Sequence, residues 1–215
     1  MYGPTGGQPL REDLPYRATG KKGATRARMA EQLLAAHAAG RARVAIGRGS
    51  DFFGEGVRNS LLGEIVFSNL LRGKAAQVLG NIDLPHTVTY VGDFGRALVL
   101  LGERDEALGQ VWHVPNAEPR LTLRASIERI AAVAGVSPRI SAMPKPVFEV
   151  LSLFHPMLRE FRELRHQVNE PWVVDHARFV TAFGDISTPL DEALRRTVDW
   201  YRGELSNVVA ERAVR

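Results

Sequence analysis

The chain has 215 residues, of which 45% are hydrophobic and 24% are charged. This size and composition are typical of one globular domain, or of one domain with a small lobe, and exclude a fully disordered chain. The sequence contains no cysteine, which excludes disulfides, thiolate nucleophiles and cysteine-ligated metal sites. No apolar run is long enough to span a bilayer, and the first residues do not resemble a signal peptide. We therefore expect a cytoplasmic protein without a membrane partner.

The net charge is +4, and most of the basic residues are arginines. Basic residues are concentrated in two stretches, 21–28 and 159–166. Both stretches are compatible with solvated helix faces. They are also compatible with a phosphate-bearing ligand, because the arginine guanidinium matches phosphate oxygens in shape and charge. No basic run is interleaved with aromatic residues, so we expect no nucleic-acid partner.

Predicted helices and strands alternate along the chain. Residues 1–20 have the proline and glycine content of a loop, and residues 24–40 form a helix with an apolar stripe. An apolar strand over 43–48 follows almost at once, which is typical of an α/β step. Further along we predict a helix over 60–72, strands over 76–80 and 86–91, a helix over 94–102 capped by Asp93, a strand over 110–114, helices over 121–134, 146–168, 175–183 and 189–202, and a frayed tail over 206–215. This order predicts the α/β class with a parallel sheet.

The predicted strand over 43–48 runs into a loop of small, polar and aromatic residues over 49–56. Open α/β sheets bind their ligands outside the carboxyl ends of the strands, so this loop is a candidate binding segment. The histidines do not occur in the spacings of a zinc site, and no G-x-S-x-G motif is present. We therefore expect neither a metal site nor a serine triad.

Several short motifs occur in the order and spacing of a known family. They are Met1-Tyr2-Gly3; Val44 to Arg48 followed by Phe53-Gly54-Glu55-Gly56; Gly73-Lys74, Gly80 and the run from His86 to Ala97; and Gly109 to Val114. Over residues 1–130 the set resembles the extended short-chain dehydrogenase/reductase family, in its NAD-dependent epimerase/dehydratase group.

The resemblance implies a fold, a cofactor and an activity. The expected fold is the C-terminal part of a Rossmann-type, doubly wound parallel sheet over 1–115, with substrate-lobe insertions, and a mainly helical substrate lobe over 116–205. The expected cofactor is NAD or NADP, and the expected activity is that of an oxidoreductase, epimerase or dehydratase on a small carbonyl or hydroxyl compound. The alternative is a catalytically silent, NAD(P)-binding sensor or regulatory protein. A homodimer is compatible with the resemblance.

Two features of the family are missing from the sequence. The G-x-x-G-x-x-G turn, which lets a helix N-terminus approach a pyrophosphate, is absent, so we expect an N-terminally truncated member. The Tyr-x-x-x-Lys pair is also absent, and on the family's pattern Lys22 takes the tyrosine position and Arg26 the lysine position. Lys22 could act as an acid only if its pKa fell toward neutrality, whereas Arg26 could hold a ribose hydroxyl or a phosphate.

The resemblance also gives each candidate site residue a role. Lys22 is the expected catalytic residue, and His86 lies where the family often carries an arginine for a substrate diphosphate, so a smaller substrate is expected. The alternatives are that Lys22 and Arg26 are solvated cations, that Asp51 caps a turn and that His86 is an edge-strand residue. The expected cofactor-binding residues are Tyr2, Arg26, Arg48, Gly49, Ser50 and Asp51, and the expected substrate-binding residues are Phe53 and His86.

Overall fold

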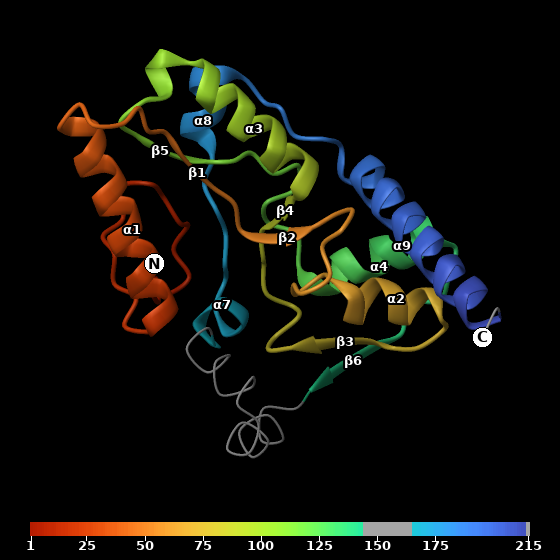
Figure 1. Ribbon diagram of the computed structural model, residues 1–215. Coiled ribbons are helices and arrows are strands. Elements are labelled where there is room, and N and C mark those ends of the chain that lie inside the picture. The colour runs from red at the N-terminus through yellow and green to blue at the C-terminus, as the bar shows by residue number, and fades with distance from the viewer. Residues whose placement is uncertain (144–164, 214–215) are drawn as a thin grey trace.

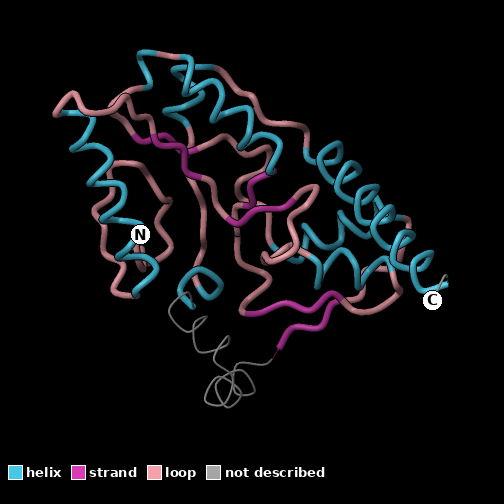
Figure 2. Tube along the Cα trace, in the orientation of Figure 1, coloured by secondary structure: helices cyan, strands magenta, loops and turns pink. Residues whose placement is uncertain are grey.

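The computed structural model describes residues 1–143 and 165–213 and places helices around short pairs of strands (Figure 1). The helices are α1 (Lys21–Ala38), α2 (Glu64–Leu71), α3 (Val91–Glu103), η1 (Asp105–Ala107), α4 (Leu123–Ala134), α7 (Arg165–Asn169), α8 (Ala177–Phe183) and α9 (Leu190–Ala213). The strands are β1 (Ile46–Arg48), β2 (Asp51–Phe53), β3 (Ala76–Leu79), β4 (Val88–Tyr90), β5 (Val111–His113) and β6 (Ile140–Met143). Figure 2 shows long loop segments between these short elements, and residues 1–20, which precede α1, are loop as well.

The strands pair in parallel, as the sequence predicts. β1 pairs with β5, with Gly47 opposite Trp112, and β2 pairs with β4, with Phe52 opposite Thr89. β3 pairs with β6 in the same sense. The two strands of each pair are separated in sequence by at least one helix, as a parallel pair requires, because its connection must cross over. The predicted α/β class is therefore confirmed.

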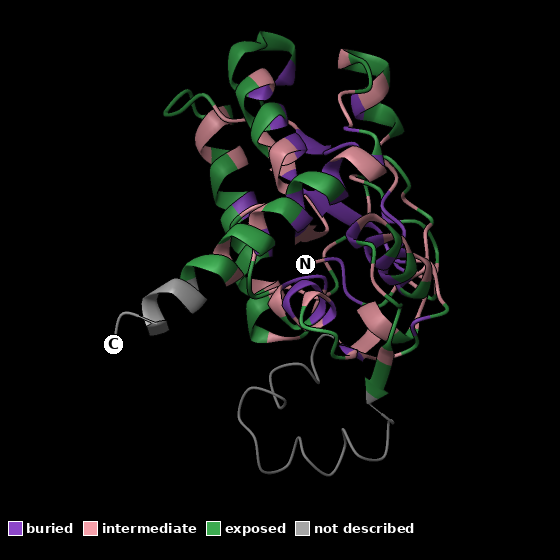
Figure 3. Ribbon diagram, turned by 90° about the vertical axis from the view of Figure 1, so that its right-hand side faces the viewer, coloured by how far each residue is buried: buried purple, intermediate pink, exposed green. Residues whose placement is uncertain are grey.

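The largest hydrophobic cluster lies between α2, β3, α4 and α9. Figure 3 shows buried residues gathered between the helices, with exposed residues along the outer faces. The Phe67 ring on α2 stacks on the Tyr201 ring on α9, with centroids 5.1 Å apart, and the Tyr201 hydroxyl donates to the Val57 carbonyl. Phe53 and Tyr90, which end β2 and β4, belong to the same cluster. The cluster thus joins residues from both sides of the expected boundary at residue 115.

Two smaller clusters hold the other end of the molecule. In one, Trp112 on β5 packs against α3 and against Phe179 on α8. In the other, Tyr2 and Leu10 of the N-terminal loop pack against Trp172 and Val174. The Leu10 amide donates to the Val173 carbonyl at 2.7 Å, and the Asp175 amide donates to the Leu10 carbonyl at 2.9 Å. The loop over 1–20 is therefore anchored to a segment more than one hundred and fifty residues later in the sequence.

Most predicted helices are present, and their ends have identifiable causes. α4 begins where the Thr122 hydroxyl accepts a hydrogen bond from the Ala125 amide at 3.1 Å, and it ends at Gly135, whose φ of 65° favours glycine. α9 extends to Ala213, so the segment expected to fray from residue 206 is helical as far as that residue. The helix predicted over 146–168 lies mostly outside the described residues.

Asp93 differs from its expected role as a helix cap. Tyr90 is the N-cap of α3, and the buried Asp93 carboxylate instead accepts hydrogen bonds from the amide and hydroxyl of Thr188, at 2.9 and 2.6 Å. Arg96, one turn along α3, forms an ion pair with the same carboxylate. Asp93 is 1% exposed, so it connects the start of α3 to the turn before α9 inside the protein.

Replacing Asp93 with alanine is expected to lower the free energy of unfolding by about 2–4 kcal/mol, because the Thr188 donors would remain buried without an acceptor. The matched control is Asp199→Ala, which removes an exposed partner of Arg202 and should cost less than about 0.5 kcal/mol. Urea unfolding followed by circular dichroism measures both. Equal losses would show that the Asp93 contacts do not stabilise the fold.

Candidate functional site

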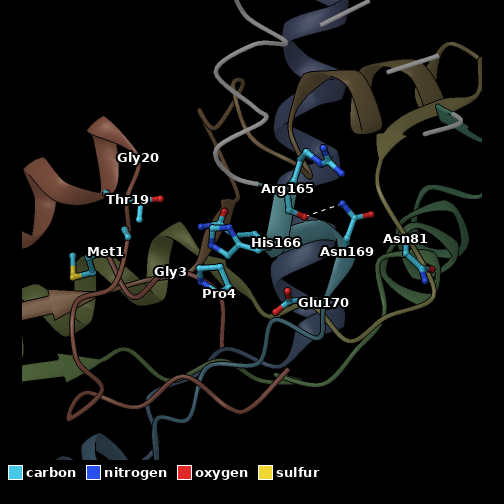
Figure 4. Close-up of a pocket in the computed structure, with 13 residues that line it drawn as sticks. Met1, Gly3, Pro4, Thr19, Gly20, Asn81, Arg165, His166, Asn169 and Glu170 are labelled. Carbon is cyan, nitrogen blue, oxygen red and sulfur yellow. Dashed lines mark hydrogen bonds between the residues drawn. The ribbon is translucent and has the colours of Figure 1, made fainter. Parts of the chain in front are cut away.

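A cavity of about 680 Å³ lies between the N-terminal loop, the start of α1 and α7 (Figure 4). This volume is within the range of small-molecule and cofactor sites. The polar side chains that line the cavity come mainly from α7 and the residue after it, which face the loop wall formed by Met1, Gly3 and Thr19. The complete lining is Met1, Gly3, Pro4, Ala18, Thr19, Gly20, Gly23, Asn81, Arg165, His166, Gln167, Asn169 and Glu170.

The α7 side of the cavity carries groups of different chemistry. Arg165 supplies a guanidinium, His166 an imidazole and Glu170 a carboxylate that accepts a hydrogen bond from the Gly6 amide at 3.1 Å. The Asn169 side chain donates to the Arg165 carbonyl at 2.9 Å (Figure 4). The cavity therefore offers a cation, an acid and amides, which together can orient a polar ligand.

The opposite side contains the first turn of α1. Its N-cap, Gly20, provides no side-chain acceptor, and its first turn holds no acidic residue. A Cβ at Gly23 would lie 2.4 Å from the Ala18 Cβ, so only glycine allows the loop to pack this closely against the helix. Gly20 and Gly23 line the cavity, so the partly positive end of the helix faces it.

Arg48 fixes the loop that forms the cavity wall. Its guanidinium lies 5.1 Å from the ring centroids of both Tyr2 and Tyr16 and donates hydrogen bonds to both hydroxyls. The Tyr2 and Met1 carbonyls in turn accept hydrogen bonds from the Arg17 and Ala18 amides, at 3.2 and 3.0 Å. Arg48 is 8% exposed, so this expected cofactor residue holds the loop internally and does not line the cavity.

His113 extends the same buried cluster. Its Nε2 lies 2.7 Å from the Tyr2 hydroxyl, and its Nδ1 lies 2.8 Å from the Asp175 carbonyl. Because a carbonyl can only accept, Nδ1 carries the proton in this arrangement and the Tyr2 hydroxyl donates to Nε2. Burial lowers the pKa of His113, although the nearby Glu12 carboxylate opposes the shift, and burial raises the pKa of Tyr2 to about 12.

The structure brings together two expected site residues, Asp51 and His86. The His86 Nε2 lies 2.6 Å from the Asp51 carboxylate, and its Nδ1 lies 3.1 Å from the Gln167 carbonyl. His86 is 2% exposed and does not line the cavity, whereas Gln167 does. The pair therefore connects β2 and the segment that leads into β4 to α7, and it positions α7 at the cavity.

The segment 49–56, predicted as a loop, contains strand β2, and its other residues are used in packing. A Cβ at Gly49 would lie 2.9 Å from the Phe52 ring, the Ser50 amide donates to the Thr89 hydroxyl at 2.8 Å, and Phe53 is buried against Tyr90. None of these residues is part of the described cavity lining. Their expected roles in binding cofactor and substrate stay predictions.

Lys22 and Arg26 are exposed on the first turns of α1. Neither belongs to the cavity lining, although Gly20 and Gly23 on either side of Lys22 do. The expected roles of Lys22 in catalysis and of Arg26 in cofactor binding therefore stay predictions too. Arg165 and His166 belong to the basic stretch 159–166, which the sequence indicated as compatible with a phosphate-bearing ligand. No motif contains His166, Asn81 or Glu170, and only the tertiary structure brings them to the cavity.

The family model described as "NAD dependent epimerase/dehydratase family" matches residues 1–114 of the chain. The chain belongs to the NAD-dependent epimerase/dehydratase family. This confirms the resemblance stated on the motifs from Tyr2 to Val114. No curated protein matches the chain in a sequence search.

Solved structures of epimerases and dehydratases share the fold. A UDP-N-acetylglucosamine 4-epimerase from Methanobrevibacter ruminantium in complex with UDP-N-acetylmuramic acid matches with a TM-score of 0.74 and 19% identity, over 94% of this chain and 60% of that one. An epimerase from Methanothermobacter thermautotrophicus matches with a TM-score of 0.75 and 14% identity, over 96% of this chain and 57% of that one. A dTDP-glucose 4,6-dehydratase from Bacillus anthracis in complex with NAD matches with a TM-score of 0.69 and 17% identity, over 94% of this chain and 58% of that one.

These matches establish a Rossmann-type fold, while the chain spans about 60% of the length of the structures it resembles. Among the described residues, no group of histidine and acidic side chains could hold a metal ion. None of the helices in the described part of the chain combines the length and apolar character needed to cross a membrane.

Replacing Arg48 with methionine is expected to loosen the cavity wall, because methionine fills the apolar space but cannot bind the Tyr2 and Tyr16 hydroxyls. The amides of Arg17 and Ala18 should then exchange with solvent at least about tenfold faster. Hydrogen–deuterium exchange measures this, and the control Arg43→Met removes an exposed arginine paired with Asp105. Unchanged exchange in Arg48→Met would show that other contacts hold the loop.

The lowered pKa of His113 predicts an effect of pH on stability. Between the unfolded pKa of 6.5 and the lower folded value, the unfolded state binds more protons, so the free energy of unfolding falls as the pH decreases through this range. His176, whose pKa is also lowered by burial, adds to the same slope. In His113→Asn, whose amide can still donate to the Asp175 carbonyl, urea unfolding at several pH values should show a shallower slope. The wild-type slope in this variant would contradict the assignment.

Proposed function

We propose that this family member takes part in NAD(P)-dependent oxidoreductase, epimerase or dehydratase chemistry on a small carbonyl or hydroxyl compound. The cavity between the N-terminal loop, α1 and α7 is the proposed site for the nicotinamide end of the cofactor and for the substrate. The observation that carries the proposal is the convergence of Arg165, His166 and Glu170 on this cavity, opposite the first turn of α1. When bound, the nicotinamide supplies or accepts a hydride.

The residues present fit the nicotinamide half of the cofactor. The uncapped start of α1 and the Arg165 guanidinium face the cavity from two sides, and both favour a phosphate or ribose. Arg26, exposed on the next turn of α1, is proposed to reach the same groups. The sequence contains no G-x-x-G-x-x-G turn for the pyrophosphate, so the affinity of this chain for a nicotinamide nucleotide should be weak.

The side chains favour a substrate smaller than a nucleotide sugar. At the position where the family often has an arginine for a diphosphate, His86 is bound by Asp51 and by the Gln167 carbonyl. Both ring nitrogens are therefore occupied within the protein, and His86 is not free to hold a diphosphate. Among the described residues that line the cavity, Arg165 is the one arginine. A single guanidinium is suited to bind one compact anionic or polar group.

A second candidate function is that of an NAD(P)-binding sensor or regulatory protein without turnover. The absence of the Tyr-x-x-x-Lys pair from the sequence favours it. Both functions require a nicotinamide nucleotide in the cavity, and they differ in whether a proton is exchanged with a bound substrate.

Binding is tested by titrating the chain with NADH and with nicotinamide mononucleotide, the second of which needs no pyrophosphate turn. We expect a Kd of about 0.1–1 mM for each nucleotide, measured by ligand-observed NMR. Thr19→Trp, which puts a bulky ring at the exposed cavity wall, should weaken binding at least about tenfold. The control Thr181→Trp, at an exposed position on α8 outside the cavity, should bind as the wild type does. If neither nucleotide binds at millimolar concentration, the proposal is wrong.

A further inference from the structure

We propose that His166 is the acid–base residue of the cavity, in place of the tyrosine that the sequence lacks. This inference rests on the proposed function, because it assigns the proton transfer that accompanies hydride transfer in the same cavity. It also differs from the expectation of the sequence, which places Lys22 in this role. Three observations carry it: the position of the imidazole, the packing that holds it and the situation of the competing groups.

The first observation is position. Among the described residues that line the cavity, the side chains that can ionise are those of Arg165, His166 and Glu170. Figure 4 shows His166 reaching from α7 toward the wall that carries Pro4 and Thr19, whereas the Glu170 carboxylate accepts a hydrogen bond from the Gly6 amide. A guanidinium does not release its proton in proteins, and imidazole ordinarily changes its charge between pH 5 and 8. The imidazole is therefore best suited to exchange a proton near neutral pH.

The second observation is that packing holds the imidazole in place. The ring of His166 lies edge-on to Trp172, with centroids 5.5 Å apart. Two backbone hydrogen bonds of 2.8 Å fix Trp172: its amide donates to the Pro85 carbonyl, and its carbonyl accepts from the Thr87 amide. The Glu170 amide donates to the His166 carbonyl at 3.1 Å, which closes the turn of α7. A residue that transfers protons needs such a defined orientation.

The third observation concerns the competing groups. His86 and His113 are each 2% exposed, and neither lines the cavity. Lys22 is exposed and does not line the cavity. Lysine also has an ordinary pKa of about 10.4, so it needs a large shift before it can donate and accept a proton near neutrality.

The proposed step balances in protons and electrons. In the direction of reduction, the substrate carbonyl carbon gains a hydride from a reduced nicotinamide, and the carbonyl oxygen gains a proton from the His166 imidazolium. The C=O double bond becomes a C–O single bond with new C–H and O–H bonds, and the imidazole is left neutral. In the direction of oxidation, neutral His166 accepts the hydroxyl proton. Arg165 and Glu170 are the other charged side chains that line this cavity. The Met1 α-amino group also borders it, with a pKa that burial lowers, and Lys22 lies on the first turn of α1.

The proposal can be tested without turnover, through the positive charge that a histidine side chain ordinarily gains in acid. The imidazolium should repel the cationic ring of oxidised nicotinamide mononucleotide but not the neutral ring of its reduced form. The measured quantity is the Kd of the oxidised nucleotide divided by the Kd of the reduced nucleotide. As the pH falls from about 8 to about 5.5, we expect this ratio to rise roughly three- to tenfold. Titration of the nucleotide's own phosphate cancels in this ratio, because both forms carry the same phosphate.

The variants separate His166 from Lys22. In His166→Phe, which keeps an aromatic ring against Trp172, and in His166→Gln, the ratio should be independent of pH, with folding checked by circular dichroism. The control His37→Gln changes a histidine at the far end of α1 and should keep the wild-type response. A ratio that is flat in the wild type, that still rises in both His166 variants or that becomes flat only in Lys22→Met overturns the assignment while leaving the proposed function intact. Failure of both nucleotides to bind refutes the proposed function, and this inference with it.

Discussion

The candidate site depends on the burial of one guanidinium. Arg48 ends β1 inside the protein, and the rings and hydroxyls of Tyr2 and Tyr16 surround it. A buried charge is strongly destabilising unless it is bound, so the folded state must keep both tyrosines in place. These two residues lie in the loop over 1–20, which has no helix or longer strand to order it. The buried charge thus fixes a loop that would otherwise have many conformations, and that loop is one wall of the cavity.

The other wall depends on the two hydrogen-bond contacts of the buried His86. His86 binds Asp51 through one nitrogen and the Gln167 carbonyl through the other, so it connects the strands to α7. α7 is only a short helix and has no buried residue of its own, so this contact and the packing of His166 on Trp172 give it a position. Both walls are therefore held by polar residues that the family resemblance would assign to ligands. In this chain they bind protein groups and organise the cavity from outside it.

Under the proposed assignment, this member of the epimerase/dehydratase family has an acid–base group although its sequence lacks the Tyr-x-x-x-Lys pair. The start of α1 still faces the cavity, but the residues at the tyrosine and lysine positions, Lys22 and Arg26, are exposed. The acid–base function that we infer has moved across the cavity, from α1 to His166 on α7. Such a change is chemically feasible because proton transfer requires a titrating group within reach of the reacting atom, whichever helix carries that group.

The sequence by itself determined the α/β class, the parallel sense of strand pairing and the family, because these follow from local periodicity and from motifs that are contiguous in the chain. It did not predict β2 or β6, which are short strands that pair with β4 and β3. It also determined the C-terminal limit of α4 at Ala134, since Gly135 acts on the backbone next to it, whereas the predicted start at residue 121 was two residues early. It placed Asp93 at the start of α3 but not its partner Thr188, which lies far along the chain. Only the tertiary structure decided which polar residues reach the cavity. Arg48, Asp51 and His86 were candidates by position in a motif, yet each is bound by side chains or carbonyls distant in sequence. His166 belongs to no motif, and it reaches the cavity because Trp172 and the His86 contact orient α7.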